Sequence, residues 1–212
     1  PEDIVFWPND KVVPETEYDA HIPMGSLPQY FRQTTDSFKS ISKGWLSACD
    51  EKVRYFRNRM LSNDPGTLVG ISWDSTKPRS GAENKLIALA QLARKLQKPG
   101  IKLVNLQYGN FSSEIDKLQE EYGIEVIQTP EVDNKNDIDG LASLIMACDK
   151  IVSISNVTVH LAGALGKEAQ ALLAFSCDWR WGKTGSSSVW YSSVFLNRQT
   201  KIDDWNSILK QL

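Results

Sequence analysis

A strand that turns directly into a helix can bind an anion, and residues 150–167 (KIVSISNVTVHLAGALGK) have this pattern. Lys150 to Ser155 alternate small and β-branched residues, as a buried strand does. Val157 to Leu165 have apolar residues at helical spacing, and Asn156 stands where an N-cap side chain is preferred. Such a turn presents unpaired backbone N–H groups and the positive helix end, so we predict a phosphate site here.

His160 lies near the first turn of this predicted helix and is one of only two histidines in the chain. Helical-wheel counting places it about 60° from the centre of the apolar stripe. It therefore either supports the phosphate-binding turn or is a histidine satisfied within the core.

Polar residues follow another predicted strand, 67–73 (TLVGISW), in the sequence DSTKPRSG. Its hydroxyl groups, Lys77 and Arg79 are residue types that can surround a phosphate. The alternative is an ordinary solvated loop between a strand and a helix, which has a similar composition.

Residues 177–193 (CDWRWGKTGSSSVWYSS) combine three tryptophans and a tyrosine with Arg180 and Lys183. Large aromatic side chains are unfavourable to leave exposed, so we expect an aromatic wall that packs against a neighbour or a planar ring. The alternative is a C-terminal loop packed on its own domain.

Alternating strands and helices are expected to position these residues. The pattern predicts strands at 67–73, 101–107, 124–129, 150–155, 169–175 and 194–198, and helices at 44–61, 84–97, 113–122, 137–148, 157–165 and 203–212. This order predicts an α/β fold: a Rossmann-like three-layer domain with a parallel sheet over residues 64–212. Residues 1–63 would be an irregular, proline-rich lead-in and junction.

Composition excludes several classes of protein. A net charge of −2 argues against nucleic-acid binding, and no apolar run is long enough for a membrane span. Three scattered cysteines indicate reduced thiols in a cytoplasmic protein, and with two lone histidines they give no metal-ligand cluster. No GxGxxG, GxxxxGK[ST] or GxSxG motif is present, which disfavours an NAD enzyme. Because the chain begins at Pro1 and has no signal peptide, we expect a piece of a longer protein.

Several stretches together resemble a known family. GISWDSTKPRSG, NLQYG, the helix led by Asp137, SISNVTVHLAGALGK and DWRWGKTGSSSVWY occur in this order in a bacterial glycosyltransferase-like module found after tetratricopeptide repeats (TPR). That module is related to the ADP-heptose:lipopolysaccharide heptosyltransferases and, more distantly, to the O-GlcNAc transferases. The resemblance covers about residues 20–212, and HIPMGSLP is similar to the junction between the two halves. It implies the C-terminal, donor-binding half of a GT-B fold, in which two Rossmann-like domains face a cleft.

The resemblance also implies site residues. The donor phosphates would face Ser72, Trp73, Ser75 and Lys77, and the nucleoside would lie beside Gln107 and Tyr108. The helix start at Asn156, Val157 and Thr158 would bind the diphosphate, with His160 supporting the turn. The donor would be a nucleotide-diphosphate sugar, used by an inverting enzyme that needs neither metal nor another cofactor.

The sequence departs from the family at two points. Many relatives have aspartate where this chain has Ser155, and the acceptor site and usual catalytic base belong to the N-terminal half. His21 is the one candidate base near the junction. The resemblance therefore implies a glycosyltransferase if an N-terminal GT-B half lies upstream in the same chain. It also implies TPR upstream, and the acceptor is unknown. The alternatives are a catalytically inactive binding or scaffold module attached to helical repeats, and a sugar-nucleotide epimerase, which the motifs fit less well.

Overall fold

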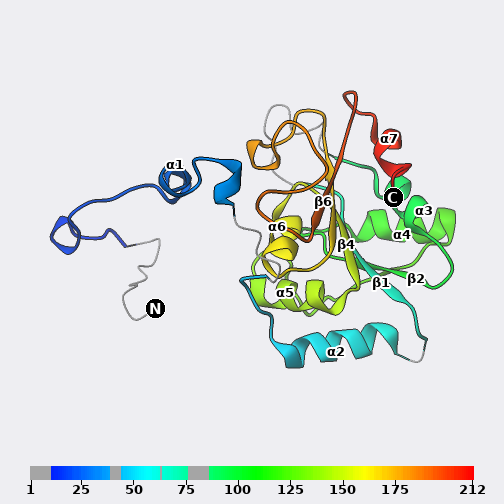
Figure 1. Cartoon of the computed structure of the whole chain (residues 1–212). Helices are drawn as coiled ribbons and strands as arrows, with labels where there is room; N and C mark the ends of the chain where they lie inside the picture. The colour runs from blue at the N-terminus through cyan, green and yellow to red at the C-terminus, as the bar shows by residue number, and fades with distance from the viewer. Residues whose placement is uncertain (1–10, 39–43, 63, 76–85) are drawn as a thin grey trace. The chain divides into compact units, whose positions relative to one another are not determined.

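The computed structural model describes residues 11–38, 44–62, 64–75 and 86–212. The chain divides into two compact units, Pro1–Lys39 and Ser40–Leu212. The described part of the first unit contains the short helix α1 (Pro28–Phe31) and three 3₁₀ turns: η1 (Glu15–Glu17), η2 (Met24–Ser26) and η3 (Thr35–Ser37) (Figure 1). These short elements agree with the irregular lead-in predicted from its prolines.

A six-stranded sheet forms the centre of the second unit, which contains the predicted Rossmann-like domain. Its strands are β1 (Thr67–Ser72), β2 (Ile101–Asn105), β3 (Val126–Ile127), β4 (Lys150–Ile154), β5 (Ala169–Leu173) and β6 (Val194–Arg198). The order is β3-β2-β1-β4-β5-β6, and every neighbouring pair is parallel. This is the strand order of the Rossmann fold, so the predicted fold class is confirmed.

Helices cover both faces of this sheet (Figure 1). One face packs against α5 (Ile138–Ala147) and α6 (Val157–Ala164), and the other packs against α3 (Leu89–Leu96), α4 (Ser112–Tyr122) and α7 (Trp205–Leu209). Side chains of β1 alternate between the two cores, since Leu68 faces the first and Val69 and Ile71 face the second. Among the described residues, no helix is long and apolar enough to cross a membrane.

The first helix of the second unit, α2 (Asp50–Leu61), begins later than the predicted residue 44. The backbone before it is extended, and Leu46 N donates to the Ala164 carbonyl oxygen at 3.0 Å. Gly44 lies so close to the backbone after α6 that a Cβ atom there would clash with Leu165. The prediction was wrong here because Gly44 packs against the end of α6 and Leu46 hydrogen-bonds to it, so this segment does not continue a helix.

Other elements are also shorter than predicted. Helix α3 begins at Leu89 and not at the predicted residue 84, because the backbone of Ala88 is extended, and β5 ends at Leu173, two residues early. Strand β3 pairs only at Val126 and Ile127, because it is an edge strand with β2 as its one partner in the sheet. Strand β2 ends at Asn105, two residues before the predicted end. Helix α7 starts at Trp205 because Asp203 has a positive φ of 60° and the Asp204 side chain caps the helix. By contrast, α4 ends at Tyr122 as predicted, and the residue after it, Gly123, has a φ of 64°, which suits glycine.

Two adjacent aromatic residues of α2 provide a test of its packing. Phe56 is 5% exposed and lies in the core beneath the helix, whereas Tyr55 is 56% exposed. We expect Phe56→Ala to lower the free energy of unfolding by about 3–5 kcal/mol, because a buried ring is replaced by a cavity. Tyr55→Ala is the matched control and should change it by less than about 1 kcal/mol. Urea denaturation measures both, and equal losses would contradict the packing of α2 described here.

Candidate functional site

The strand order reverses direction between β1 and β4, which are neighbours in the sheet. In open parallel sheets, ligands bind outside the carboxyl ends of the strands at such a switch point. Ser72 ends β1, and Asn156 follows β4 at the start of α6. The structure therefore brings the end of β1 and the start of α6 together at the position that this fold uses for ligands.

The Asn156 side chain connects the start of α6 to β1. Its Oδ1 atom accepts from Thr158 N at 3.0 Å, as an N-cap does, and from Ser153 Oγ at 3.0 Å. Its Nδ2 atom donates to Ser72 Oγ at 2.7 Å and to the Asp74 carbonyl oxygen at 3.4 Å. Because these four contacts occupy the amide, Asn156 positions the helix start.

The Gln107 side chain connects β2 to the same turn. Its Oε1 atom accepts from Ser72 Oγ at 2.8 Å and from the backbone N–H groups of Trp73 and Asp74 at 2.9 Å each. Its Nε2 atom donates to the carbonyl oxygens of Asp74 and Tyr108, each at 3.1 Å. Gln107 is buried, and its amide holds the chain after β1 in place.

The backbone at the start of α6 provides the groups that an anion can contact. An α-helix leaves its first N–H groups without intrahelical partners, and Asn156 accepts from that of Thr158. Val157 is the first residue of α6 and is 44% exposed. Thr158 is buried, with its hydroxyl 3.5 Å from the Leu106 carbonyl oxygen. Of these two donors, the N–H of Thr158 is already engaged by Asn156, whereas that of Val157 belongs to an exposed residue.

The other predicted phosphate and nucleoside residues are divided between the site and the core. Tyr108 donates its hydroxyl to Ser75 Oγ at 3.3 Å, which joins the loops after β2 and β1. The indole of Trp73 is buried in the core on the other face of the sheet, where its Nε1 atom donates to Glu114 at 3.1 Å. The backbone of Trp73 thus belongs to the site and its side chain does not. Lys77 and Arg79 lie outside the described residues.

His160 lies in a stack of aromatic rings on α6. Its ring is stacked on that of Trp181 with centroids 4.7 Å apart, and its Nδ1 atom lies 3.1 Å from the Tyr191 hydroxyl. Tyr191 in turn stacks on Trp45 at 5.4 Å and lies against Gly163, where a Cβ atom would overlap its ring. These contacts engage the His160 ring with Trp181 and Tyr191, and its role as support for the turn stays a prediction.

Burial also affects the charge of this stack. Desolvation lowers the pKa of His160, and the positive charge of Arg180 lowers it further, against an opposing effect of Asp178. Desolvation raises the pKa of Tyr191. Both side chains are therefore neutral at pH 7, and the pair is held by a neutral hydrogen bond.

Ser155 has a partner within this stack. The Nε1 atom of Trp181 donates to Ser155 Oγ at 2.7 Å. Trp181 is buried, so part of the tryptophan-rich segment 177–193 packs on its own domain, as the second sequence interpretation expected. The hydroxyl of Ser155 thus fastens this segment beside the start of α6.

Sequence reasoning assigned no individual role to three polar residues at this edge of the sheet, Asp74, Asn134 and Ser153. Burial raises the pKa of Asp74, and the nearby Glu114 charge adds to the increase while a hydrogen bond from Ser75 N opposes it. Asn134 donates to the Gln107 carbonyl oxygen at 3.2 Å, and Ser153 donates to Asn156. Asn134 lies in a loop and Ser153 lies within β4, and neither position has a sequence spacing that identifies its contact. The described residues contain no group of three potential His, Cys, Asp or Glu metal ligands.

His21, the candidate base, belongs to the first unit. It is exposed, and its ring makes an edge-on contact with Tyr18 at 5.8 Å. Its proposed role in catalysis stays a prediction.

The Asn156 network can be tested by its contribution to stability. Asn156→Ala removes the cap of α6 and the donor to Ser72, and we expect it to lower the free energy of unfolding by about 2–3 kcal/mol. Asn156→Asp keeps the capping oxygen, so it should recover about 1 kcal/mol of that loss. Chemical denaturation of the two variants measures the difference. An alanine variant as stable as the wild type would show that the network does not hold the turn.

The neutral His160 predicts a pH dependence of stability. Because its pKa is lowered in the folded state, the unfolded chain binds a proton more readily below about pH 6.5. Stability from this residue is therefore present above that pH and is lost as the pH falls toward the folded pKa. We expect His160→Asn to reduce the difference in urea midpoint between pH 7.5 and 5.5. An unchanged difference would mean that other groups cause the pH dependence.

A known bacterial protein is similar in sequence to most of this chain. No family model matches the chain. The Caulobacter vibrioides protein FlbA is 30% identical over 178 residues, which are 84% of this chain and 29% of FlbA. The chain thus spans less than a third of that relative.

Solved structures resemble the fold. Escherichia coli ADP-heptose lipopolysaccharide heptosyltransferase II matches with a TM-score of 0.53 and 17% identity, over 78% of this chain and 53% of that chain. A glycosyl transferase family 9 protein from Veillonella parvula matches with a TM-score of 0.50 and 17% identity, over 74% of this chain and 43% of that one. The chain therefore has an α/β Rossmann-like fold that resembles about half of a family 9 glycosyltransferase.

Proposed function

We propose that this chain is the nucleotide-sugar-binding half of an inverting, metal-independent glycosyltransferase. The observation that carries the proposal is the network of Gln107, Ser72 and Asn156, which fixes the start of α6 at the switch point of the sheet. The resemblance of the fold to family 9 glycosyltransferases supports it.

The start of α6 suits a diphosphate leaving group. In an inverting transfer, the acceptor oxygen attacks the anomeric carbon while the bond to the donor diphosphate breaks and its electron pair stays on the diphosphate. The helix dipole and the N–H of Val157 would stabilise this growing charge, and the sequence adds Lys77 as a cation. These groups can do so with no metal ion.

The remaining parts of the reaction are assigned to the rest of a longer protein. The matched structures have about as much chain again beyond the aligned region, and FlbA is longer still. We propose that an N-terminal GT-B half upstream supplies the acceptor site and the base that takes the acceptor proton, with TPR beside it. His21 is the candidate for that base within this chain.

Val157 allows the helix start to be tested with little disturbance of the fold. Proline is accommodated at the first position of a helix, and the extended backbone of Asn156 (φ −144°, ψ −171°) is compatible with a following proline. Val157→Pro therefore removes one N–H donor and leaves the helix in place. If UDP, GDP, ADP or CMP binds, we expect this variant to weaken that nucleotide about 10-fold or more, as for loss of a charge-assisted hydrogen bond.

Val157→Ala is the matched control, because it shortens the same side chain and keeps the N–H group. It should change the dissociation constant by less than about two-fold. Titrations followed by NMR, with and without EDTA, measure binding and its independence of metal. Equal effects of the proline and alanine variants, or loss of binding in EDTA, would contradict the proposal.

Ser155 favours a second candidate, a catalytically inactive module that acts as a binding or scaffold domain. Its hydroxyl is engaged by Trp181 and it offers no carboxylate to a donor or acceptor. If the protein with its upstream sequence restored binds none of the four nucleotides, the scaffold function replaces the transferase.

A further inference from the structure

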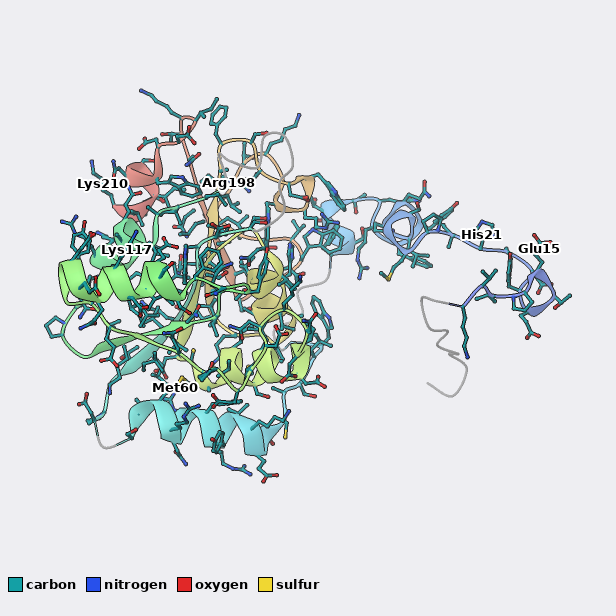
Figure 2. All side chains as sticks on the ribbon, turned by 180° about the vertical axis from the view of Figure 1, so that it is seen from behind. Glu15, His21, Met60, Lys117, Arg198 and Lys210 are labelled. Carbon is teal, nitrogen blue, oxygen red and sulfur yellow. The ribbon has the colours of Figure 1, made fainter. Side chains whose placement is uncertain are left out.

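The tryptophan-rich loop after β5 has an unusual anchor on the next strand. Arg198, at the end of β6, donates from Nε to the Gly185 carbonyl oxygen at 2.8 Å and from Nη1 to that of Gly182 at 3.1 Å. Its Nη2 atom donates to the Trp181 carbonyl oxygen. Figure 2 labels Arg198 at this end of β6. One guanidinium thus fixes the backbone of residues 181–185.

The same loop is fastened to the candidate site by Trp181, through its ring stack with His160 and its hydrogen bond to Ser155. Asp178 is the N-cap of the turn η5 (Trp179–Trp181), and its side chain accepts from Arg180 N. Trp179 is two residues from Trp181, so their Cα atoms are at most about 7 Å apart. Trp179 is therefore linked to the start of α6 through Trp181, and its own carbonyl oxygen accepts from Gly182 N.

Trp179 is 63% exposed, although indole is among the side chains most favourable to bury. The guanidinium of Arg180 lies over its ring, 4.9 Å from the centroid, and is itself held by Asp178 at 2.8 Å. Trp190 makes an edge-on contact with Trp179 at 6.2 Å. An exposed ring held on a hydrogen-bonded turn, with a cation over one of its faces, is a preorganised surface for a ring-shaped ligand.

The strand order indicates which part of a donor would reach this ring. Tyr108 follows β2 and Trp179 follows β5, so they lie on opposite sides of the switch point between β1 and β4. Three strand spacings separate β2 from β5, about 14 Å. In a nucleotide sugar, the nucleoside and the sugar are attached to opposite ends of the diphosphate. With the diphosphate at α6 and the nucleoside beside Tyr108, the sugar extends toward Trp179.

We propose that Trp179 is a sugar-binding platform, on which the pyranose ring of the transferred sugar stacks. This inference rests on the proposed function for its placement relative to the diphosphate. The apolar C–H face of a pyranose carries partial positive charge and is attracted to the negative face of the indole. The guanidinium of Arg180 has five N–H donors, one of which is bonded to Asp178, so others can reach sugar hydroxyl groups.

The experiment follows the indole N–H signal of Trp179 by NMR, with the signal assigned from the Trp179→Phe spectrum. The first probes are the methyl glycosides of glucose, galactose, mannose and N-acetylglucosamine, which need no nucleotide site. We expect at least one to shift the Trp179 signal. Tyr122→Ala is the matched control, since Tyr122 is another exposed ring with an arginine, Arg94, 5.1 Å from its centroid. It should leave the Trp179 shifts unchanged.

The second probes compare each nucleotide with its sugar conjugate: UDP with UDP-glucose, GDP with GDP-mannose, ADP with ADP-glucose and CMP with CMP-N-acetylneuraminate. Trp179→Ala should weaken a bound conjugate about five-fold and the bare nucleotide by less than two-fold. Trp179→Phe should recover most of the loss.

The outcomes separate this proposal from the proposed function. If Trp179→Ala weakens the nucleotide and its sugar conjugate equally, the sugar platform is overturned in favour of a nucleobase platform. If Trp179→Ala changes the dissociation constant of neither, the sugar platform is also overturned. No shift of the Trp179 signal with any glycoside or conjugate overturns it as well. A shift with a glycoside in a protein that binds no nucleotide supports the platform while the transferase proposal fails.

Discussion

Three neighbouring strands end in loops that are held together through Ser72. Its hydroxyl donates to Gln107 after β2 and accepts from Asn156 after β4, while Ser72 itself ends β1. Both amides then use their remaining atoms on the backbone of the same turn. Because Ser72 and Gln107 are buried, each of these polar groups depends on the others for its hydrogen bonds. The position of the α6 start, and with it any anion site, depends on this shared network.

The sequence predicted the order of strands and helices well, since apolar periodicity and capping residues are local signals. Asp137, Asn156 and Gly123 were each expected at a helix end and are found there. Element ends were less predictable where a distant segment decides them. Residues near Trp45 have helical spacing, but the segment pairs with the end of α6, which is more than 100 residues away in the sequence. The extent of β3 likewise depends on its partner β2 and not on its own propensity.

The sequence indicated which strand ends could carry a site, but not how the side chains there are arranged. Trp73 was expected to face the donor phosphates, yet its indole is buried in the core. Asn156 caps the helix as expected, and the rest of its amide is occupied by the chain. Which way a side chain points from a strand end is set by packing across the sheet, which sequence spacing does not report. The contact between Ser155 and Trp181 joins residues 26 apart, and no motif contains it.

Arg198 holds the tryptophan-rich loop by its main chain, through carbonyl oxygens of residues 181–185. Any residue type offers a carbonyl oxygen, so this anchor does not depend on the side chains that the loop carries. The side chains of Lys183 and Thr184 are exposed and can change without loss of the loop's shape. Single substitutions at these two positions can therefore change which ligands bind beside Trp179 while the backbone of the loop keeps its conformation.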